Sequence, residues 1–367
     1  MTNAESRPCP QIFYPDDPFY IDEHTRRFQG CPTIAVTRGG RIFLGWYAGG
    51  WREPHMENFN LLVYSDDDGK TWSQPVFVIP SSKPRCVHAN DIQLWISPSG
   101  ALELYWVQND TLKFSQELRR EHPNPDDWYY IDGYLFGDDR HTEWRTVCLD
   151  PDAEKLTFSA PELLDYGFLR CKPLVLSSGR QINFNYDQVD EKAYGYSISD
   201  DGGKTFRRVH SGKKIDTWFD EAMAYERRDG SIRMFARAHC GELAECISRD
   251  GGETFEGAVK SGIRHADSRF FVSRTPSGRI LLVTNDAKSR TNLTVFLSDD
   301  DGETFPYGAV VDTREQISYP DADFHGGKIY LTYDRERTGA KEILFLSFTE
   351  DDVISGRLPT PSVVSKP

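Results

Sequence analysis

The sequence predicts an all-β fold, a six-bladed β-propeller of four-stranded antiparallel blades. Two independent repeats support this prediction. A turn that ends in glycine and leads into a strand-like run occurs six times, at Gly40, Gly100, Gly179, Gly230, Gly278 and Gly327. The phrase S-x-D-x-G-x-T-[W/F] occurs four times, beginning at Ser65, Ser199, Ser248 and Ser298. The last four of the glycines are 51, 48 and 49 residues apart, and a fixed period of this size is typical of repeated supersecondary units.

Each glycine turn is predicted to join two strands. The run after the turn, such as RIFLGWY after Gly40 or ALELYWV after Gly100, alternates or is continuously apolar, as in half-buried or buried strands. The S-x-D-x-G-x-T-W phrase follows about twenty residues later as a second turn. Two hairpins per unit give a four-stranded meander, and six meanders around an axis hide their sheet edges by repetition.

The acidic phrase itself is predicted to be structural. Its Ser and Asp side chains can satisfy the backbone of the turn, its Gly can adopt positive φ, and its aromatic residue can pack between blades. The phrases place much of the chain's acidic charge on the rim that carries the glycine turns. The opposite rim, called the mouth below, is therefore expected to be less acidic than the average.

The bulk properties exclude several classes of function. A net charge of -14 argues against binding to nucleic acid or to an anionic membrane surface. Residues 1–367 are expected to form a single domain, without an apolar run of membrane-spanning length. The start of the chain lacks a leader pattern, which predicts a cytoplasmic protein, with an extracellular or periplasmic location as the alternative if a leader was removed.

The cysteines are predicted to be buried free thiols. There are seven, an odd number without paired spacing. Because the chain has neither a CxxC motif nor a His/Cys cluster, we expect no metal and no cofactor. The oligomeric state is left open.

Alignment of the units on their turn glycines predicts which residues gather at the mouth. The innermost strand begins about nine residues before each glycine, at Cys31, Asp91, Arg170, Glu221, Arg269 and Ser318, the last beside Tyr319. The second strand ends about seven residues after it, at Tyr47, Val107, Arg237, Asn285 and Asp334, with the third unit shifted by one residue. Charged groups collected around one axis indicate a binding site. The alternative is a solvated funnel whose ions pair with one another.

Loops between the second and third strands are expected to overhang the mouth. In the first unit this loop, AGGWREPHMEN, carries Arg52, His55 and Glu57, and in the fifth unit DAKSRT carries Arg290. The second unit has a long inserted loop, about residues 108–143. This insertion could form a partial lid, supply a substrate wall, or serve equally as a surface decoration or an oligomer contact.

These residues resemble the sialidase superfamily. The four acidic phrases resemble its Asp boxes, and Glu221 and Arg237 in DEAMAYERRDGSIRMFAR stand where sialidases carry a Glu and an Arg. Arg290 opens RTNLTV, similar to the family phrase R-x-N-L-T-V, and Tyr319 in SYPD stands where the last blade carries the nucleophilic tyrosine. The resemblance implies a retaining exo-glycoside hydrolase that removes a terminal acidic sugar from a carbohydrate.

The implied roles are chemically consistent. A neutral phenol can approach an anomeric centre that bears a carboxylate without charge repulsion, but its high pKa requires a base. The resemblance makes Tyr319 the nucleophile and Glu221 this base. Arg237 and Arg290 would bind the substrate carboxylate as planar forks, and Arg269, Arg170, Arg52, Asp91 and Asp334 are further substrate-binding candidates.

Two positions depart from the family pattern. Gly30 in QGCP replaces the first-blade arginine of the carboxylate-binding triad, and Arg27, Arg52 or Arg269 could substitute in space. The acid/base Asp falls in PHMEN, where Glu57 is the favoured general acid and His55 the alternative. Both departures favour a related ulosonic acid or a uronic acid over ordinary sialic acid.

Two other classes of function stay open. One is a polysaccharide lyase, in which Tyr319 or His55 abstracts a proton next to a uronate carboxylate neutralised by arginines. The other is a non-catalytic carbohydrate-binding or scaffold propeller, because a fold does not fix a function.

Overall fold

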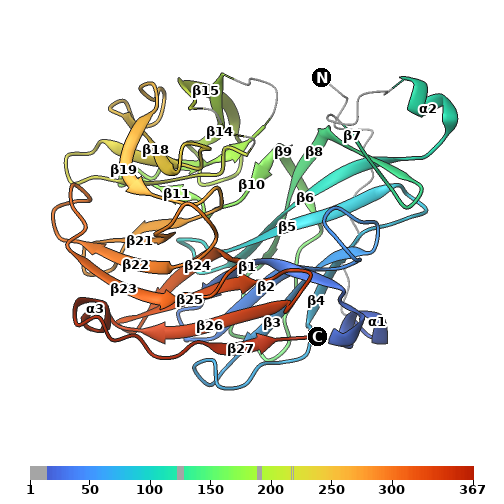
Figure 1. Ribbon diagram of the computed structural model, residues 1–367, viewed down its shortest axis with the longest axis horizontal. Helices are drawn as coiled ribbons and strands as arrows, with labels where there is room; N and C mark the ends of the chain where they lie inside the picture. Colours follow the sequence, from blue (N-terminus) through green and yellow to red (C-terminus); the bar gives the residue numbers. More distant parts are fainter. Residues whose placement is uncertain (1–14, 122–127, 188–191, 216, 218) are drawn as a thin grey trace.

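The computed structural model describes residues 15–121, 128–187, 192–215, 217 and 219–367. It contains six antiparallel sheets of four or five strands, arranged as the blades of a propeller around a central axis, and one two-stranded sheet within the third blade (Figure 1). The predicted fold class and number of blades are therefore confirmed.

The strands follow one another blade by blade, and their bounds are as follows. The first blade contains β1 (Phe28–Val36), β2 (Ile42–Gly49), β3 (Asn58–Ser65) and β4 (Phe77–Pro80). The second contains β5 (Val87–Ile96), β6 (Leu102–Lys113), β7 (Trp128–Ile131), β8 (Tyr134–Cys148) and β9 (Glu162–Tyr166). The third contains β10 (Phe168–Leu169), β11 (Leu174–Val175), β12 (Gln181–Asn183), β13 (Asn185–Tyr186), β14 (Ala193–Ser199) and β15 (Arg207–Lys213). The fourth blade contains β16 (Ala222–Glu226), β17 (Ile232–Ala236), β18 (Glu242–Ser248) and β19 (Val259–Arg264). The fifth contains β20 (Phe271–Arg274), β21 (Ile280–Asn285), β22 (Leu293–Ser298) and β23 (Tyr307–Asp312). The sixth contains β24 (Ile317–His325), β25 (Lys328–Arg335), β26 (Glu342–Phe348) and β27 (Ser362–Ser365). The short helices are α1 (Pro18–Ile21), η2 (Glu23–Thr25), α2 (Gln116–Glu121) and α3 (Glu350–Ile354).

The six glycine turns have the conformation that the repeat predicted. Their φ angles lie between 78° and 94°, a region that residues with a Cβ atom rarely adopt. Inner strands such as β2 are buried along their whole length because a neighbouring blade covers each face. This burial on both faces explains why runs such as RIFLGWY after Gly40 are almost continuously apolar.

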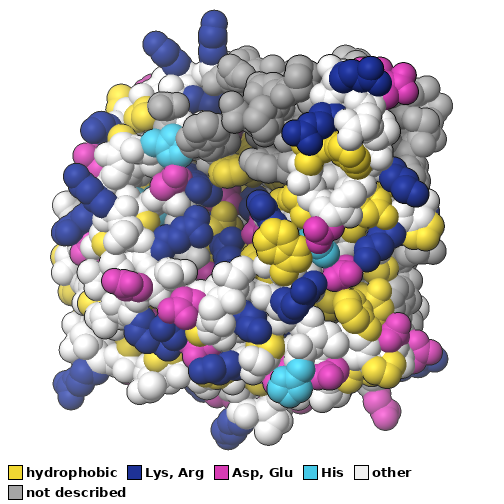
Figure 2. Space-filling view, turned by 45° about the vertical axis from the view of Figure 1, so that its right-hand side comes forward, with side chains coloured by type: hydrophobic (Ala, Val, Ile, Leu, Met, Phe, Trp, Pro, Cys, Tyr) yellow, Lys and Arg dark blue, Asp and Glu magenta, His cyan; other side chains and the backbone are white. Residues whose placement is uncertain are grey.

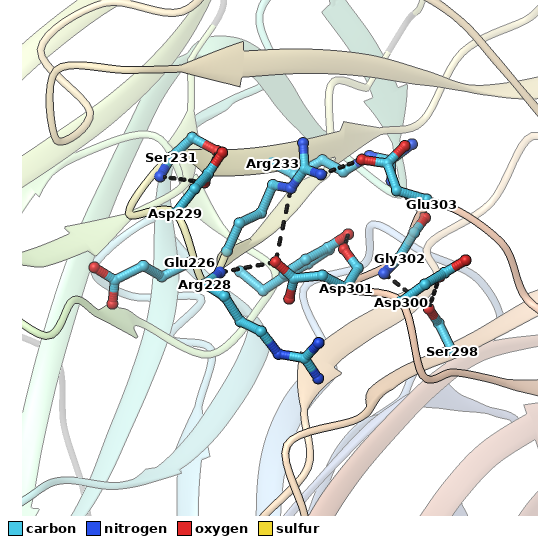
Figure 3. A network of polar contacts seen from close by, with 12 residues as sticks. Glu226, Arg228, Asp229, Ser231, Arg233, Ser298, Asp300, Asp301, Gly302 and Glu303 are labelled. Atoms are coloured by element: carbon cyan, nitrogen blue, oxygen red, sulfur yellow. Dashed lines mark hydrogen bonds and ion pairs between the residues drawn. The ribbon is translucent and has the colours of Figure 1, made fainter.

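The acidic phrases form structural turns, as predicted. In the fourth copy, the Ser298 hydroxyl donates to Asp300 at 2.7 Å, and Gly302 donates its N–H to the Ser298 hydroxyl oxygen at 2.8 Å (Figure 3). Asp300 also accepts the backbone N–H of Thr304 at 2.9 Å. Bonds within the turn, first that from the Thr304 hydroxyl, lower the pKa of Asp300 to about 2. The backbone N–H of Arg228 in the fourth blade donates to Asp301 at 2.7 Å. The turn therefore ties neighbouring blades together on the rim away from the mouth.

The ring closes without a shared strand. The Asp323 carboxylate on β24 accepts the backbone N–H of Val36 at 2.9 Å, and Asp321 accepts that of Ile34 at 2.9 Å. These charge-assisted bonds join the last blade to the first and fix the end of β1 beside the second half of β24.

Three innermost strands contain the same irregularity at the mouth. The β1–β2, β5–β6 and β24–β25 pairings each shift register, and the bulged residues Cys31, Asp91 and Tyr319 have φ angles of 55°, 52° and 55°. A bulge of this kind bends the strand and redirects a side chain. In the third blade the innermost pairing is broken into β10–β13 and β11–β12, which confirms that its register differs.

The described residues of the insertion in the second blade form mainly strands and a short helix, where an inserted loop was expected. β6 continues to Lys113 and pairs with the start of β8, and β7 and β8 form a further hairpin. This extension and α2 project from the wheel at the upper right of Figure 1. The pairing of the insertion with an extended β6 depends on contacts that sequence periodicity does not reveal.

Two bulk expectations can be compared with the described residues. The six cysteines described, Cys31, Cys86, Cys148, Cys171, Cys240 and Cys246, are free thiols, and four of them are buried. Over the same residues, every helix is too short or too polar to span a bilayer.

Candidate active site

Tyr319 lies at the centre of the mouth. Its side chain is 3 % exposed, and its hydroxyl oxygen accepts a hydrogen bond from Arg237 Nη1 at 3.2 Å. Burial and the nearby Glu221 carboxylate raise the pKa of the phenol, so it is protonated at neutral pH. Four further guanidinium carbons lie 4.1–5.5 Å from the ring centroid, those of Arg170, Arg269, Arg290 and Arg337. Figure 2 shows a hollow face bordered by Lys and Arg side chains.

Glu221 is the carboxylate that shares an arginine with this tyrosine. It is 2 % exposed and accepts Arg237 Nη1 at 2.9 Å, the same nitrogen that reaches the phenol. Its other oxygen lies 3.2 Å from Arg170 Nε. Burial alone would raise the pKa of this carboxyl, but neighbouring guanidinium groups, first that of Arg237, outweigh it and lower the pKa to about 2. Glu221 is therefore an ionised acceptor throughout the neutral range.

Arg237 and Arg290 both lie close to Tyr319: Arg237 Nη1 is 3.2 Å from its hydroxyl oxygen, and the guanidinium carbon of Arg290 is 5.5 Å from its ring centroid. Both contact Asp267, a residue that sequence reasoning missed: Arg237 Nε forms an ion pair with its carboxylate, and Arg290 Nη2 donates to its carbonyl at 3.2 Å. His239 Nδ1 lies 2.8 Å from the other carboxylate oxygen. Asp267 therefore orients both arginines. Asp267 lies two residues before Arg269, in the segment that leads into the fifth blade. The alignment on the turn glycines compared only the start of the first strand and the end of the second strand, so it did not include this residue.

Four other predicted residues line the mouth but are largely satisfied by the protein. Arg170 forms an ion pair with Asp91. Arg269 Nη2 donates to the carbonyl oxygens of Pro32 at 2.7 Å and of Tyr319 at 3.1 Å, so it braces the bulge from behind. Asp334 is fully buried and accepts the Ser318 hydroxyl at 2.7 Å. These contacts hold the ring of inner strands in place.

Arg337 occupies the space opened by Gly30. A Cβ atom on Gly30 would lie 2.7–2.8 Å from three side-chain atoms of Arg337, which follows β25 in the sixth blade. Arg337 Nε lies 2.9 Å from Asp334, and Nη1 lies 3.3 Å from Glu53. Its Nη2 is buried without a hydrogen-bond partner among the described residues, and its guanidinium carbon is 4.1 Å from the Tyr319 ring centroid.

The three arginines expected to compensate for Gly30 have other contacts. Arg27 Nη2 lies 3.3 Å from Glu57, Arg52 packs 5.5 Å from the indole centroid of Trp51, and Arg269 binds backbone carbonyls. The sequence signal for Arg337 was the unusual glycine itself, which leaves room for a side chain from elsewhere.

Glu57, which the sequence favoured as the general acid, forms two ion pairs at the surface. Its carboxylate is 3.0 Å from Lys83 and 3.3 Å from Arg27. The hydrogen bond from Lys83, the largest effect, lowers the pKa of Glu57, whereas a general acid must hold its proton. In the same loop, Glu53 reaches Arg337 beside the Tyr319 ring, and sequence reasoning had passed over it.

His55, the alternative acid, is buried and has both ring nitrogens bonded. The Glu57 backbone N–H donates to Nδ1 at 3.1 Å, which places the proton on Nε2, and Nε2 lies 2.8 Å from Asp132 on the insertion. The ring therefore links the first-blade loop to the turn between β7 and β8.

One group of residues in the described chain brings three potential metal ligands together. The thiol of Cys31 and one carboxylate oxygen each of Glu53 and Asp91 lie within 4.8 Å of one another. Burial raises the pKa of the Cys31 thiol to about 12, and a thiol ligand must be deprotonated. The two carboxylates already pair with Arg337 and Arg170. This chemistry favours an ion-pair network over a metal centre.

Comparisons with known proteins agree with this architecture. A family model described as BNR repeat-like domain matches residues 88–331, and a BNR/Asp-box repeat model matches residues 63–74 around the first acidic phrase. The chain belongs to the BNR repeat-like family. No curated protein matches this chain.

Solved structures share the propeller at low sequence identity. The NanB sialidase from Streptococcus pneumoniae is 18% identical, with 95% of this chain and 71% of that chain covered and a TM-score of 0.68. The intramolecular trans-sialidase from Ruminococcus gnavus is 17% identical, with 94% and 98% covered and a TM-score of 0.66. A protein of unknown function from Dyadobacter fermentans is 19% identical, with 90% and 95% covered and a TM-score of 0.63. The fold of this BNR repeat protein is therefore similar to that of these two sialidase structures.

Proposed function

We propose that the protein is a retaining exo-glycoside hydrolase that removes a terminal acidic sugar from a glycan. The observation that carries this proposal is the bridge through Arg237, whose Nη1 contacts both the Tyr319 phenol at 3.2 Å and the ionised Glu221 carboxylate at 2.9 Å. Few structural roles require a buried, protonated phenol beside a carboxylate and five guanidinium groups.

In the first step, the Tyr319 oxygen attacks the anomeric carbon and the phenol proton passes to Glu221. The bond from the anomeric carbon to the leaving oxygen breaks, and that oxygen takes a proton from a general acid. Arg237 stabilises the negative charge that develops on the phenol oxygen during attack. In the second step, water attacks the anomeric carbon and gives a proton to the conjugate base of the general acid, the bond to Tyr319 breaks, and Glu221 returns its proton to the phenolate oxygen. Two inversions at the anomeric carbon retain the configuration.

Arginines on two sides of Tyr319 account for preference toward an acidic sugar. The guanidinium carbons of Arg290 and Arg337 lie 5.5 Å and 4.1 Å from the ring centroid, and Arg337 Nη2 finds no hydrogen-bond acceptor within the described parts of the chain. A substrate carboxylate would give this buried donor a partner, and a bond to a charged group contributes more than a neutral one. A neutral sugar would leave the donor unpaired.

Glu53 is assigned as the general acid in place of Glu57. A proton donor must come within hydrogen-bond reach of the leaving oxygen, so position is the first criterion. Glu53 lies 3.3 Å from Arg337, which stacks on Tyr319, whereas Glu57 is bound to Lys83 and Arg27.

The proposal is tested with a panel of aryl glycosides of sialic acid, other ulosonic acids and uronic acids. We expect release of the free sugar with retained anomeric configuration, followed by NMR. Tyr319→Phe should abolish turnover while circular dichroism and thermal melting stay unchanged. An unsaturated product that absorbs in the ultraviolet would instead establish a lyase, and wild-type turnover by Tyr319→Phe would contradict the assigned nucleophile.

A further inference from the structure

Trp51 is an exposed aromatic side chain at the edge of the mouth. It lies in the loop between β2 and β3 and is 44 % exposed. Of the large apolar side chains that are exposed in the described part of the chain, it is the single tryptophan. Leaving so large an apolar ring in water is unfavourable, which calls for an explanation at this position.

The indole ring is held in a fixed orientation by the insertion of the second blade. Trp51 Nε1 donates to Asp132 Oδ2 at 2.9 Å, and His55 Nε2 reaches the same oxygen at 2.8 Å. The His55 ring meets the indole edge-on with a centroid separation of 6.2 Å, and the guanidinium of Arg52 lies 5.5 Å from the indole centroid. Asp132 adopts a φ angle of 46° at the tip of the β7–β8 hairpin. Contacts from two blades therefore fix one exposed ring.

The position of Trp51 relative to the reacting groups follows from the loop. Glu53 is two residues further along, so the two Cα atoms are at most about 7 Å apart. The Glu53 carboxylate lies 3.3 Å from Arg337, whose guanidinium is 4.1 Å from the Tyr319 ring centroid. In the proposed reaction the leaving oxygen must approach Glu53, and the remainder of the substrate then extends over this loop.

We propose that Trp51 is the binding platform for the sugar on the leaving-group side of the scissile bond, so that the enzyme acts on the ends of glycans with at least two sugars. This inference rests on the proposed function. The apolar C–H face of a sugar ring packs on an aromatic face, and an indole that is already immobilised loses little conformational entropy on binding. The insertion thereby supplies one substrate wall through Asp132.

The test compares two leaving groups on the same acidic sugar. Wild type, Trp51→Ala and a control, Leu149→Ala, are assayed with 3′-sialyllactose and with sialyl fluoride, or with the matching pair for whichever acidic sugar the panel identifies. Leu149 is 83 % exposed and follows β8 on the opposite rim. We expect Trp51→Ala to lower kcat/KM about tenfold on the sialylated disaccharide and less than about twofold on the fluoride, because only the former has a ring to stack. An equal loss on both substrates, or none on either, would overturn the proposal.

A binding measurement separates this proposal from the proposed reaction. The Trp51 indole N–H resonance is assigned by its absence in Trp51→Phe. The Tyr319→Phe protein is titrated with 3′-sialyllactose and with free sialic acid, or with the matching oligosaccharide and free sugar for whichever acidic sugar the panel identifies. We expect the oligosaccharide to shift this resonance and the monosaccharide to leave it in place. Failure of all panel substrates to turn over would refute the proposed function even if this shift is observed. Binding of 3′-sialyllactose without a shift at Trp51 would refute the platform even if the hydrolase is active.

Asp132→Ala tests the positioning role of the insertion. It removes the acceptor of both Trp51 and His55 but leaves the indole in the chain. We expect a loss on the oligosaccharide that is smaller than that of Trp51→Ala, with unchanged turnover of the fluoride. If Asp132→Ala matched wild type on both substrates, the insertion would not form part of this subsite.

Discussion

Moving one guanidinium group from the sixth blade to the first tests how the mouth recognises a carboxylate. Arg337 fills the space above Gly30, and the three atoms nearest to a Cβ built on Gly30 all belong to Arg337. The variants are Arg337→Ala, Gly30→Arg and the double variant that combines them. Arg335→Ala is the matched control, because Arg335 pairs with Glu336 and Glu342 near the same turn.

The expected magnitudes follow from the contacts. A hydrogen bond to a charged group contributes about 1.5–3 kcal/mol, so Arg337→Ala should lower kcat/KM on an acidic glycoside about 10- to 150-fold. Gly30→Arg alone places its Cβ 2.7 Å from Arg337 Cγ, and overpacking of this kind costs about 1–3 kcal/mol of stability. In the double variant the obstructing atoms are absent, so the new arginine can enter the mouth from Gly30.

The assay is kcat/KM on an acidic glycoside and on its carboxamide analogue, with thermal melting of each variant. We expect Arg337→Ala to lose selectivity for the acid, Gly30→Arg to melt earlier, and the double variant to regain part of both properties. Equal losses on acid and amide would show that Arg337 only supports the fold. A double variant no better than the worse single variant would refute the idea that the two positions share one guanidinium site.

Three further predictions concern single residues. Glu221→Gln should lower the free energy of unfolding by about 3–5 kcal/mol above about pH 5. Because the pKa of Glu221 is lowered to about 2, this difference from wild type should shrink as the pH falls toward 2. A difference that does not change with pH in urea titrations would contradict the lowered pKa. Glu53→Gln should lose most of its kcat on alkyl glycosides and little on activated aryl glycosides, while Glu57→Gln stays near wild type on both; the reverse ranking would restore Glu57 as the acid. Asp300→Ala should lower the urea midpoint of unfolding, because three hydrogen bonds of the turn are lost, and should leave kcat/KM unchanged. A changed kcat/KM would show that the rim with the acidic turns affects the active site.

The blades and the inner ring could be predicted from the sequence because their signals are local. A glycine in a tight turn recurs in all six units and the Ser/Asp turn in four of them, regardless of distant contacts, so counting the glycine turns from Gly40 predicted the number of blades. The same count placed Glu221 and Tyr319 at equivalent ends of inner strands, and the structure brings both to Arg237.

Arg337, Glu53 and Asp132 could not be predicted in this way. Arg337 reaches Gly30 only because the sixth blade closes on the first, and Glu53 is selected from its loop by that contact. Asp132 meets Trp51 because β6 and β8 are extended. Each contact joins residues of different blades, and the geometry between blades is set by packing that a single repeat does not encode.

The central claim is that Tyr319 forms the bond to the substrate, and covalent trapping tests it most directly. The enzyme is incubated with a fluorinated glycosyl fluoride of the acidic sugar, which slows the second step more than the first, then digested and analysed by mass spectrometry. The account predicts one added sugar on the peptide that contains Tyr319, and none on the Tyr319→Phe protein. A sugar found on any other residue, or rapid turnover with inverted configuration, would contradict it.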